Sequence, residues 1–360
     1  MNTRTLLISV LMLACVLLSA CAPAVTPFAP TAVPPTVTPP TVIPPTAIPA
    51  TQAPTVETLD GHVIAEWKIT DPSFIAIGFD SVWVTGHYNH TMTRIDPATN
   101  KIVAVIDGIG RQPEQALAVG DVLWVTGQYN DTTWIDPKTN TVIESAPKLN
   151  GQYLFIAYGF NSLWVTTRNN GLDRIDPVTH QVNASIELGD GRANDCMNDV
   201  LTTAAAVWVV SCDKVELIKV DPATNSVVSK TMWVTLIDQA RAQTTVPAGK
   251  GTDFIWIDVL KGDGGGSLPA GLLRIDPNTG TGLTFLPLTS DQGGDGFIAV
   301  TNEAVWVAGI GQINRVNVAT NQIDATYATD PGRLKIGIGF GSVWLRNFEK
   351  SLIQRLDIAP

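Results

Sequence analysis

Short apolar runs recur along most of the chain, and seven of them carry a tryptophan near their centre. The tryptophans recur at intervals of roughly 40 residues, a period typical of the four-stranded blades of a propeller. Aliphatic residues flank each tryptophan, a composition that favours buried strands. The seven are Trp83, Trp124, Trp164, Trp208, Trp256, Trp306 and Trp344. The pattern therefore predicts an all-β fold, a seven-bladed β-propeller.

The first repeat shows the strand pattern most clearly. Apolar or alternating residues occupy positions 74–78, 82–85, 92–96 and 101–106, with turn-forming residues between them. Gly, Asn, Asp and Pro favour turns because they tolerate positive φ, fix φ or hydrogen-bond their own backbone. We therefore expect four antiparallel strands in each blade, with the first strand innermost and the fourth outermost.

A turn motif follows the third strand of six repeats and has the form Asp-Pro-x-Thr-Asn, with variations. An Asp or Asn at its start accepts backbone N–H groups, and Pro presets φ at the next position. The last residue is Asn, His or Gly, which tolerate positive φ. The motifs begin at Asp96, Asp136, Asp176, Asp221, Asp276 and Asn317. These carboxylates are therefore predicted to form turns and not a catalytic array.

The two ends of the repeat region complement each other. The last repeat has three strands, at 334–339, 342–346 and 352–358, and then the chain stops. Residues 63–69 have the pattern of an outer strand but follow no blade. Pairing this N-terminal strand with the last repeat closes the ring and covers an open sheet edge. The propeller domain is predicted to span residues 57–360.

The first 56 residues have a different composition. Residues 1–20 carry one charge, Arg4, and an apolar run that is too short for a membrane span, which indicates a signal peptide. Residues 21–56 are rich in Pro and Thr, which predicts an extended polyproline II linker and no packed core.

The end of the signal peptide reads Leu18-Ser19-Ala20-Cys21, which resembles the bacterial lipobox. The resemblance implies diacylation of Cys21 and a lipid-anchored, extracytoplasmic protein of the bacterial cell envelope. The alternative is an ordinary signal peptide with an incidental cysteine. Beyond it, Cys196 and Cys212 are the remaining cysteines of an exported domain, and we expect them to form a disulfide.

The charge of the chain limits its partners. The net charge is −10, and loss of Arg4 with the signal peptide leaves −11. Acidic chains without runs of Lys or Arg are unsuited to binding a phosphate backbone. We therefore expect no nucleic-acid partner. The expected partners are the membrane, through the lipid, and a small polar ligand or a protein, with the chain itself a monomer.

Candidate binding residues lie in loops on one predicted face of the ring. His87, Gln128 and Arg168 stand at the same offset from the tryptophans of three consecutive repeats, and Arg111 and Arg333 lie in connections between repeats. Arg offers a fixed fork of donors, so this set predicts a site for a polar or anionic ligand. The alternative interpretation is that these are solvated loop residues.

Cofactor chemistry is sparse in this sequence, and no cofactor is predicted. Carboxylates in the later loops offer oxygen ligands for Ca²⁺, but they have no recognised calcium-binding spacing. They are Asp190, Asp195, Asp199, Asp291 and Asp295.

The repeating W-V-T and R-I-D-P-x-T-N-K-I-V-A pattern resembles the YVTN and YncE-like β-propellers and the related streptogramin B (virginiamycin B) lyases. The resemblance implies a seven-bladed propeller but no single activity, because such folds host binding proteins and enzymes. The lyases use His and Glu from late blades, whereas the last histidine here is His180. We therefore expect a binding or scaffold protein. The alternative is an enzyme acting at the central funnel, either streptogramin-lyase-like or quinoprotein-like.

Overall fold

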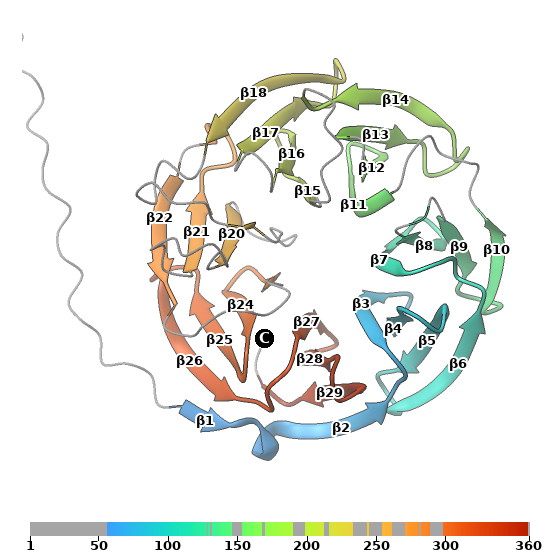
Figure 1. Ribbon diagram of the computed structural model, residues 1–360, viewed down its shortest axis with the longest axis vertical. Helices are drawn as coiled ribbons and strands as arrows, with labels where there is room; N and C mark the ends of the chain where they lie inside the picture. The colour runs from blue at the N-terminus through green and yellow to red at the C-terminus, as the bar shows by residue number, and fades with distance from the viewer. Residues whose placement is uncertain are drawn as a thin grey trace, which may run out of the picture. The chain divides into compact units, whose positions relative to one another are not determined.

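Seven small sheets form a ring around a central axis, so the fold is a seven-bladed β-propeller, as predicted (Figure 1). The computed structural model describes residues 56–127, 129, 132–145, 153–167, 170–189, 199–211, 216–232, 243–244, 254–260, 271–280, 282–288 and 298–358. In these ranges no helix is long and apolar enough to cross a membrane.

In every blade, strands that follow one another in sequence pair antiparallel and run from the axis outward; the N-terminal strands β1 and β2 add to the outer edges of blades six and seven. Blade one contains β3 (Pro72–Gly78), β4 (Ser81–Gly86), β5 (Thr91–Asp96) and β6 (Lys101–Asp107). Blade two contains β7 (Pro113–Val119), β8 (Val122–Gly127), β9 (Thr133–Asp136) and β10 (Thr141–Ser145), and blade three contains β11 (Tyr153–Gly159), β12 (Ser162–Thr167), β13 (Gly171–Ile175) and β14 (Val182–Glu187). Blade four contains β15 (Asp199–Thr202), β16 (Val207–Val210), β17 (Glu216–Asp221) and β18 (Ser226–Met232), and blade five contains β19 (Gln243–Thr244), β20 (Ile255–Leu260), β21 (Gly271–Ile275) and β22 (Gly282–Pro287). Blade six contains β23 (Ile298–Val300), β24 (Ala304–Gly309), β25 (Gln312–Asn317) and β26 (Gln322–Ala328), and blade seven contains β27 (Leu334–Gly339), β28 (Ser342–Asn347) and β29 (Leu352–Leu356).

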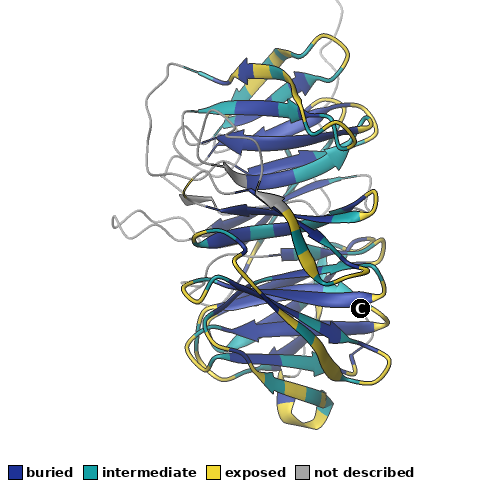
Figure 2. Cartoon of the chain, turned by 90° about the vertical axis from the view of Figure 1, so that its right-hand side faces the viewer, coloured by how far each residue is buried: buried dark blue, intermediate teal, exposed yellow. Residues whose placement is uncertain are grey.

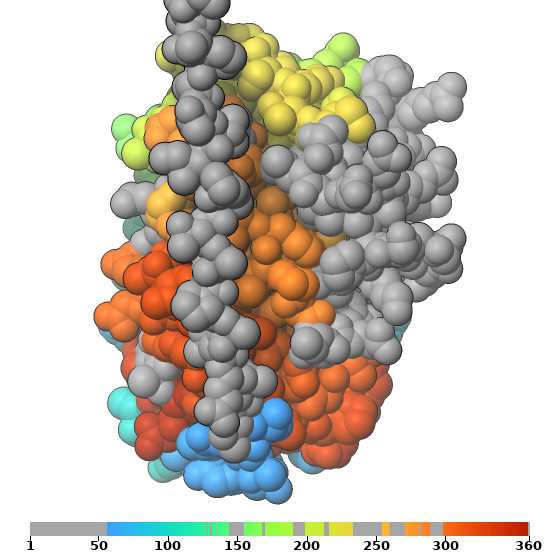
Figure 3. All heavy atoms as spheres, turned by 90° about the vertical axis from the view of Figure 1, so that its left-hand side faces the viewer, coloured from blue at the N-terminus to red at the C-terminus, as the bar shows by residue number. Residues whose placement is uncertain are grey.

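The N-terminal strands close the ring. β2 (Val63–Lys68) pairs antiparallel with β29 as the outer strand of blade seven, which confirms the predicted closure. β1 (Val56–Thr58) was not expected: it pairs parallel with β26 and gives blade six a fifth strand. The 3-10 helix η1 (Leu59–His62) joins them, and Leu59 is buried between the two blades. Figure 3 shows this N-terminal segment in blue on the surface beside the C-terminal blades.

The alternation of strand direction gives the ring two different faces. The turn face carries the hairpin turns, such as residues 79–80, and the Asp-Pro turns, such as residues 97–100. The connection face carries the loops between second and third strands, such as residues 87–90, and the connections between blades, such as residues 108–112. In side view, buried positions follow the strands and exposed positions lie at the turns and the outer strands (Figure 2).

The core lies between blades. Each repeat tryptophan is almost fully buried, and its side of the blade packs against the next blade. Trp83, for example, packs with Leu123 and Val125 of blade two. The residues on either side of Trp83, Val82 and Val84, face blade seven instead. Alternation along a strand therefore makes both faces of each sheet apolar.

The Asp-Pro turns form as predicted. Asp96 accepts hydrogen bonds from the Ala98 backbone N–H and the Thr99 hydroxyl at 2.8 and 2.7 Å. The Thr99 hydroxyl and the Ala98 N–H hold the pKa of the Asp96 carboxyl below its ordinary value. The last turn residue has positive φ in all six motifs, as at Asn100, where φ is 55°.

The structure adds a second role for these turns. Arg94 lies opposite Trp83, with its guanidinium carbon 4.8 Å from the indole centroid, and donates a 2.8 Å hydrogen bond to Asn140 Oδ1 in the turn of blade two. The same contact joins Arg174 to Asn225, Arg274 to Asn321 and Arg355 to Asn100. The Arg and Asn of the repeat therefore link neighbouring blades.

The turns without a final Asn have different partners. Trp134 replaces the arginine of blade two, and its ring centroid lies 3.8 Å from that of His180. Lys219 replaces it in blade four and donates to the Asn278 carbonyl, beside Gly280. Arg315 in blade six forms an ion pair with Asp324 of its own blade, since blade seven receives its outer strand from β2 and has no such turn.

Candidate functional site

The residue type differs between blades at one buried position near the connection face, two residues after each tryptophan. Blades one to three have Thr85, Thr126 and Thr166 there, each fully buried. Their hydroxyls bond to backbone groups of the inner strand where its register shifts, as when Phe74 N donates to Thr85 Oγ1 at 2.9 Å. Threonine at this position therefore satisfies a strand irregularity.

Blades five and seven have charged residues at the same position, Asp258 and Arg346, with 0% and 1% of their surface exposed. Blades four and six have Val210 and Ala308, so an apolar residue also fits. Our sequence-based list of site residues missed both charged groups. The detectable signal was a charged residue following the tryptophan run, in Ile-Trp-Ile-Asp258 and Val-Trp-Leu-Arg346.

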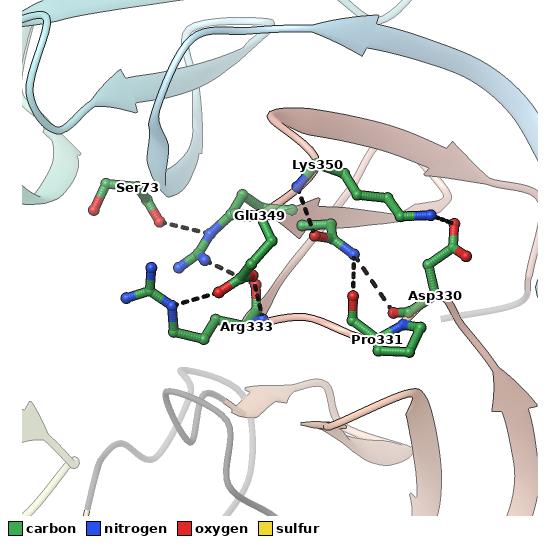
Figure 4. Close-up of polar contacts among 8 residues, drawn as sticks. Ser73, Asp330, Pro331, Arg333, Glu349 and Lys350 are labelled. Atoms are coloured by element: carbon green, nitrogen blue, oxygen red, sulfur yellow. Dashed lines mark hydrogen bonds and ion pairs between the residues drawn. The ribbon is translucent and has the colours of Figure 1, made fainter.

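Arg346 is the centre of a charged cluster between blades seven and one. Its Nε donates to the Ser73 carbonyl of β3 at 3.1 Å, and its Nη1 donates to the Arg333 carbonyl at 2.9 Å. Lys335 is its cross-strand neighbour, is only 6% exposed, and has its ammonium 5.6 Å from the Phe74 ring centroid. Figure 4 shows Ser73 approaching blade seven at this point.

Glu114 and His87 extend the cluster toward blade two. Glu114 stands at the start of β7 and is 8% exposed. Its Oε1 lies 3.9 Å from His87 Nδ1 in the loop after β4. Burial lowers the pKa of His87, the Glu114 carboxylate opposes this shift, and the Lys335 ammonium adds to it. The imidazole is therefore predominantly neutral at pH 7. We name Ser73, His87, Glu114, Lys335 and Arg346 the axial cluster.

Two exposed ion pairs lie on the connection face of blade seven. Arg333 pairs with Glu349 through Nε and Oε1 at 2.8 Å, and its backbone N–H donates to Oε2 of the same carboxylate (Figure 4). Lys350 pairs with Asp330 at 2.5 Å. Arg333, which we predicted to bind an anionic ligand, therefore already has a carboxylate partner.

The structure describes two of the other predicted binding residues, and the remaining two lie outside the described residues. His87 belongs to the axial cluster. Arg111 lies on the same face, is exposed, and has its guanidinium carbon 4.9 Å from the Tyr129 ring centroid. Gln128 and Arg168 lie outside the described residues, so their place beside His87 stays a prediction. The same holds for the lipidation site Cys21 and for the disulfide between Cys196 and Cys212.

Two buried carboxyls lie on strands of blades four and five. Asp199 on β15 is 1% exposed and accepts a 2.6 Å hydrogen bond from Val200 N at Oδ1. Neither oxygen of Asp258 on β20 hydrogen-bonds to any residue that the structure describes. Burial raises the pKa of Asp199 well above its ordinary value and that of Asp258 to about 8. Asp258 is therefore largely a neutral acid at pH 7.

Of the five carboxylates that could offer oxygen ligands to Ca²⁺, the structure describes one. Asp199 is described, whereas Asp190, Asp195, Asp291 and Asp295 lie outside the described residues. Within the described ranges, no three His, Cys, Asp or Glu residues are grouped so that they could hold a metal ion.

Solved structures share this fold at low sequence identity. Virginiamycin B lyase from Staphylococcus aureus matches with 16% identity and a TM-score of 0.66, over 82% of this chain and 98% of the lyase chain. A streptogramin B lyase matches with 17% identity and a TM-score of 0.65, over 81% and 94% of the two chains. Hydrazine synthase from Kuenenia stuttgartiensis matches with 13% identity and a TM-score of 0.65, over 82% and 97%.

No protein-family model and no curated protein matches the chain. The structural matches confirm the fold relationship to the streptogramin B lyases that the repeats indicated. At these identities the likeness concerns the fold alone, and the activity has to be argued from the site.

Proposed function

We propose that this protein is a lipid-anchored binding protein of the bacterial cell envelope, with a polar or charged ligand bound at the axial cluster. The anchor is inferred from the lipobox-like sequence ending at Cys21 and from the Pro/Thr-rich linker that follows it. In this proposal the linker separates the propeller from the membrane surface.

The observation that supports binding is the burial of Glu114, Lys335 and Arg346 on the connection face. Removing charges from water costs several kcal/mol per ion, and the attraction between them repays this cost only in favourable geometry. Other blades of the same ring have Thr, Val or Ala at the position of Arg346, so packing alone does not require a charge there. Such departures from a repeat are expected at functional sites.

A thermal-shift screen of small polar ligands against the detergent-solubilised protein tests this function, with the buried tryptophans reporting unfolding. A ligand of the axial cluster should stabilise the wild type, because binding to the folded state shifts unfolding by mass action. Lys335→Met and Glu114→Gln should each reduce that stabilisation. Lys138→Met, on the turn face of blade two, is the matched control. If a ligand stabilises Lys335→Met and Glu114→Gln as much as it stabilises the wild type and the control, it does not bind at the axial cluster, and the proposed site is contradicted.

The alternative function is a lyase-like enzyme, and one observation favours it. A neutral imidazole beside a carboxylate, as in His87 and Glu114, is the pairing that a general base requires. The test is incubation with virginiamycin B, followed by chromatography of the products. Turnover that His87→Gln abolishes would support the enzyme, and an unchanged substrate would exclude this lyase activity. A quinoprotein-like activity has no such support among the described residues.

A further inference from the structure

We propose that Tyr88, Arg111 and Tyr129 form a carbohydrate-binding surface on the connection face of blades one and two. The inference deepens the proposed binding function and rests on it, since it names the chemical class of the ligand. It depends on two exposed aromatic rings and on how the loops hold them.

The two tyrosines occupy equivalent places in neighbouring blades. Tyr88 and Tyr129 each follow the repeat tryptophan by the same number of residues, within Gly-His-Tyr-Asn and Gly-Gln-Tyr-Asn. Tyr88 is 59% exposed and Tyr129 is 42% exposed. Arg111 lies in the connection that leads from the first of these blades to the second. The three side chains therefore belong to one face and to consecutive structural units.

The ring of Tyr88 is held by a short, hydrogen-bonded loop. His87 N donates to the Asp71 carbonyl at 2.8 Å, and His90 N donates to the Gly86 carbonyl at 3.1 Å. The His87 ring meets the Tyr88 ring edge to face, with centroids 4.5 Å apart. The Asn89 side chain packs over Gly86, where an added Cβ would lie 1.9 Å from Asn89 Oδ1. The exposed ring is therefore presented by a constrained loop.

The second ring has a polar neighbour. The Arg111 guanidinium lies 4.9 Å from the Tyr129 centroid, within the range of a cation–π contact. This contact places a cationic side chain beside the ring. Ordering the rings before binding lowers the entropy cost of association.

These features match the chemistry of a sugar chain. A pyranose ring has a face of C–H groups that packs on an aromatic ring, while its hydroxyl groups form hydrogen bonds around the edge. Tyrosine suits such a ligand because it combines an apolar ring with a polar tip. The axial cluster on the same face of the ring contains the carboxylate of Glu114 and the ammonium group of Lys335, both largely buried.

The test uses the full-length, detergent-solubilised protein and affinity electrophoresis in gels that contain one polymer each. The polymers are a neutral β-glucan, an alginate and polyglutamate, which separate sugar rings from negative charge. The wild type should be retarded by at least one polysaccharide and not by polyglutamate. Tyr88→Ala and Tyr129→Ala should each weaken binding roughly 3- to 10-fold, the range expected for losing one stacking contact.

Two further variants separate stacking from folding defects. Tyr88→Phe retains the ring and should bind within about twofold of the wild type. Phe340→Ala removes a 39% exposed aromatic side chain from the turn face and should have no effect. Failure of both polysaccharides to bind the wild type would overturn the inference, and so would unchanged binding by both tyrosine-to-alanine variants. A polar ligand that depends on Lys335 but not on the tyrosines would leave the proposed binding function intact and reject the carbohydrate.

Discussion

At the scale of single residues, the repeat is best explained by contacts between blades. The Asp of each Asp-Pro turn folds its own turn, whereas the Asn at its end accepts a hydrogen bond from the arginine of the preceding blade. Where the Asn is replaced by His180 or Gly280, the arginine is replaced as well, by Trp134 or Lys219. The paired replacement indicates that the two positions act as one unit.

Asn140→Gly tests this unit. Glycine tolerates the positive φ of 58° at this position but removes the acceptor for Arg94. We expect a loss of about 1.5–3 kcal/mol in the free energy of unfolding, the cost of a hydrogen bond to a charged group. Urea denaturation followed by tryptophan fluorescence measures it. In a double-mutant cycle with Arg94→Met, the two effects should be non-additive; strict additivity would show that the contact contributes nothing.

Asp258 should make the stability of the domain depend on pH. Its folded-state pKa of about 8 lies above the unfolded value of about 4, so the folded state binds the proton more tightly. The contribution of Asp258 to the free energy of unfolding is therefore complete below pH 4. It falls as the pH rises to about 8, by at most about 1.4 kcal/mol per pH unit. Asp258→Asn cannot ionise, so its stability advantage over the wild type should grow across this range.

Chemical denaturation of both proteins at pH 4, 6 and 8 measures the difference. Asp276→Asn is the matched control, because the Asn278 backbone N–H lowers the pKa of this exposed carboxyl. The stability advantage of the wild type over Asp276→Asn is complete above the unfolded-state pKa of this carboxyl. It is lost as the pH falls through the lower folded-state pKa, so its pH dependence has the opposite sign to that of Asp258. Parallel pH dependences for the wild type and Asp258→Asn would refute the claim for Asp258.

At the scale of elements, the N-terminal segment spans two blades. β2 supplies the outer strand of blade seven through pairs from Val63↔Leu356 to Lys68↔Leu352, and Trp67 stacks on Trp344 with centroids 5.6 Å apart. β1 adds three exposed residues to the edge of blade six. The first contact completes a sheet and its core, whereas the second only extends a sheet that is already complete.

Deletions should therefore have unequal effects. Removing residues 62–70 leaves blade seven with three strands and an open edge, and we expect aggregation or loss of cooperative unfolding. Removing residues 56–58 should lower the melting temperature only slightly.

Leu59→Ala should lower the free energy of unfolding by about 2–5 kcal/mol, because it empties a buried site between the blades. Differential scanning calorimetry distinguishes the three; a cooperative transition at the wild-type temperature after the larger deletion would place ring closure elsewhere.

At the scale of the whole molecule, a propeller closed by its own N-terminus is joined to the predicted anchor through that same segment. Any force on the linker reaches β1 and η1 before β2, because they come first in the chain. The predicted lipid site at Cys21 and the closing strand β2 are therefore separate segments, joined by the linker, β1 and η1.

Cys21→Ser tests the anchor separately from the fold. The variant should appear in the soluble fraction or as an uncleaved precursor, while the melting temperature of its propeller stays unchanged. Detergent partitioning and labelling with a fatty-acid analogue measure the first effect. Normal processing and unchanged partitioning of the variant would show that Cys21 is not lipidated.

The sequence by itself determined the strands, the turns, the number of blades and the complementary ends of the ring. These features are local or periodic: the Trp83 run and the Asp96 turn depend on residues a few positions apart, and repetition averages out local error. The choice of His87 as a binding residue also followed from periodicity, because equal offsets from a repeated tryptophan predict equal places in successive blades; its role in binding stays a prediction.

Only the tertiary structure decided which charges are buried and what they contact. Arg346 meets the Ser73 carbonyl, 273 positions away in the chain, because the ring brings the last blade against the first. The same closure brings β1 beside β26. Within blade seven, the loop after β28 gives Arg333 its carboxylate partner, Glu349. Burial and side-chain pairing depend on packing between segments distant in sequence, and the pattern of one repeat does not show which partners a departure from it, such as Arg346, will contact.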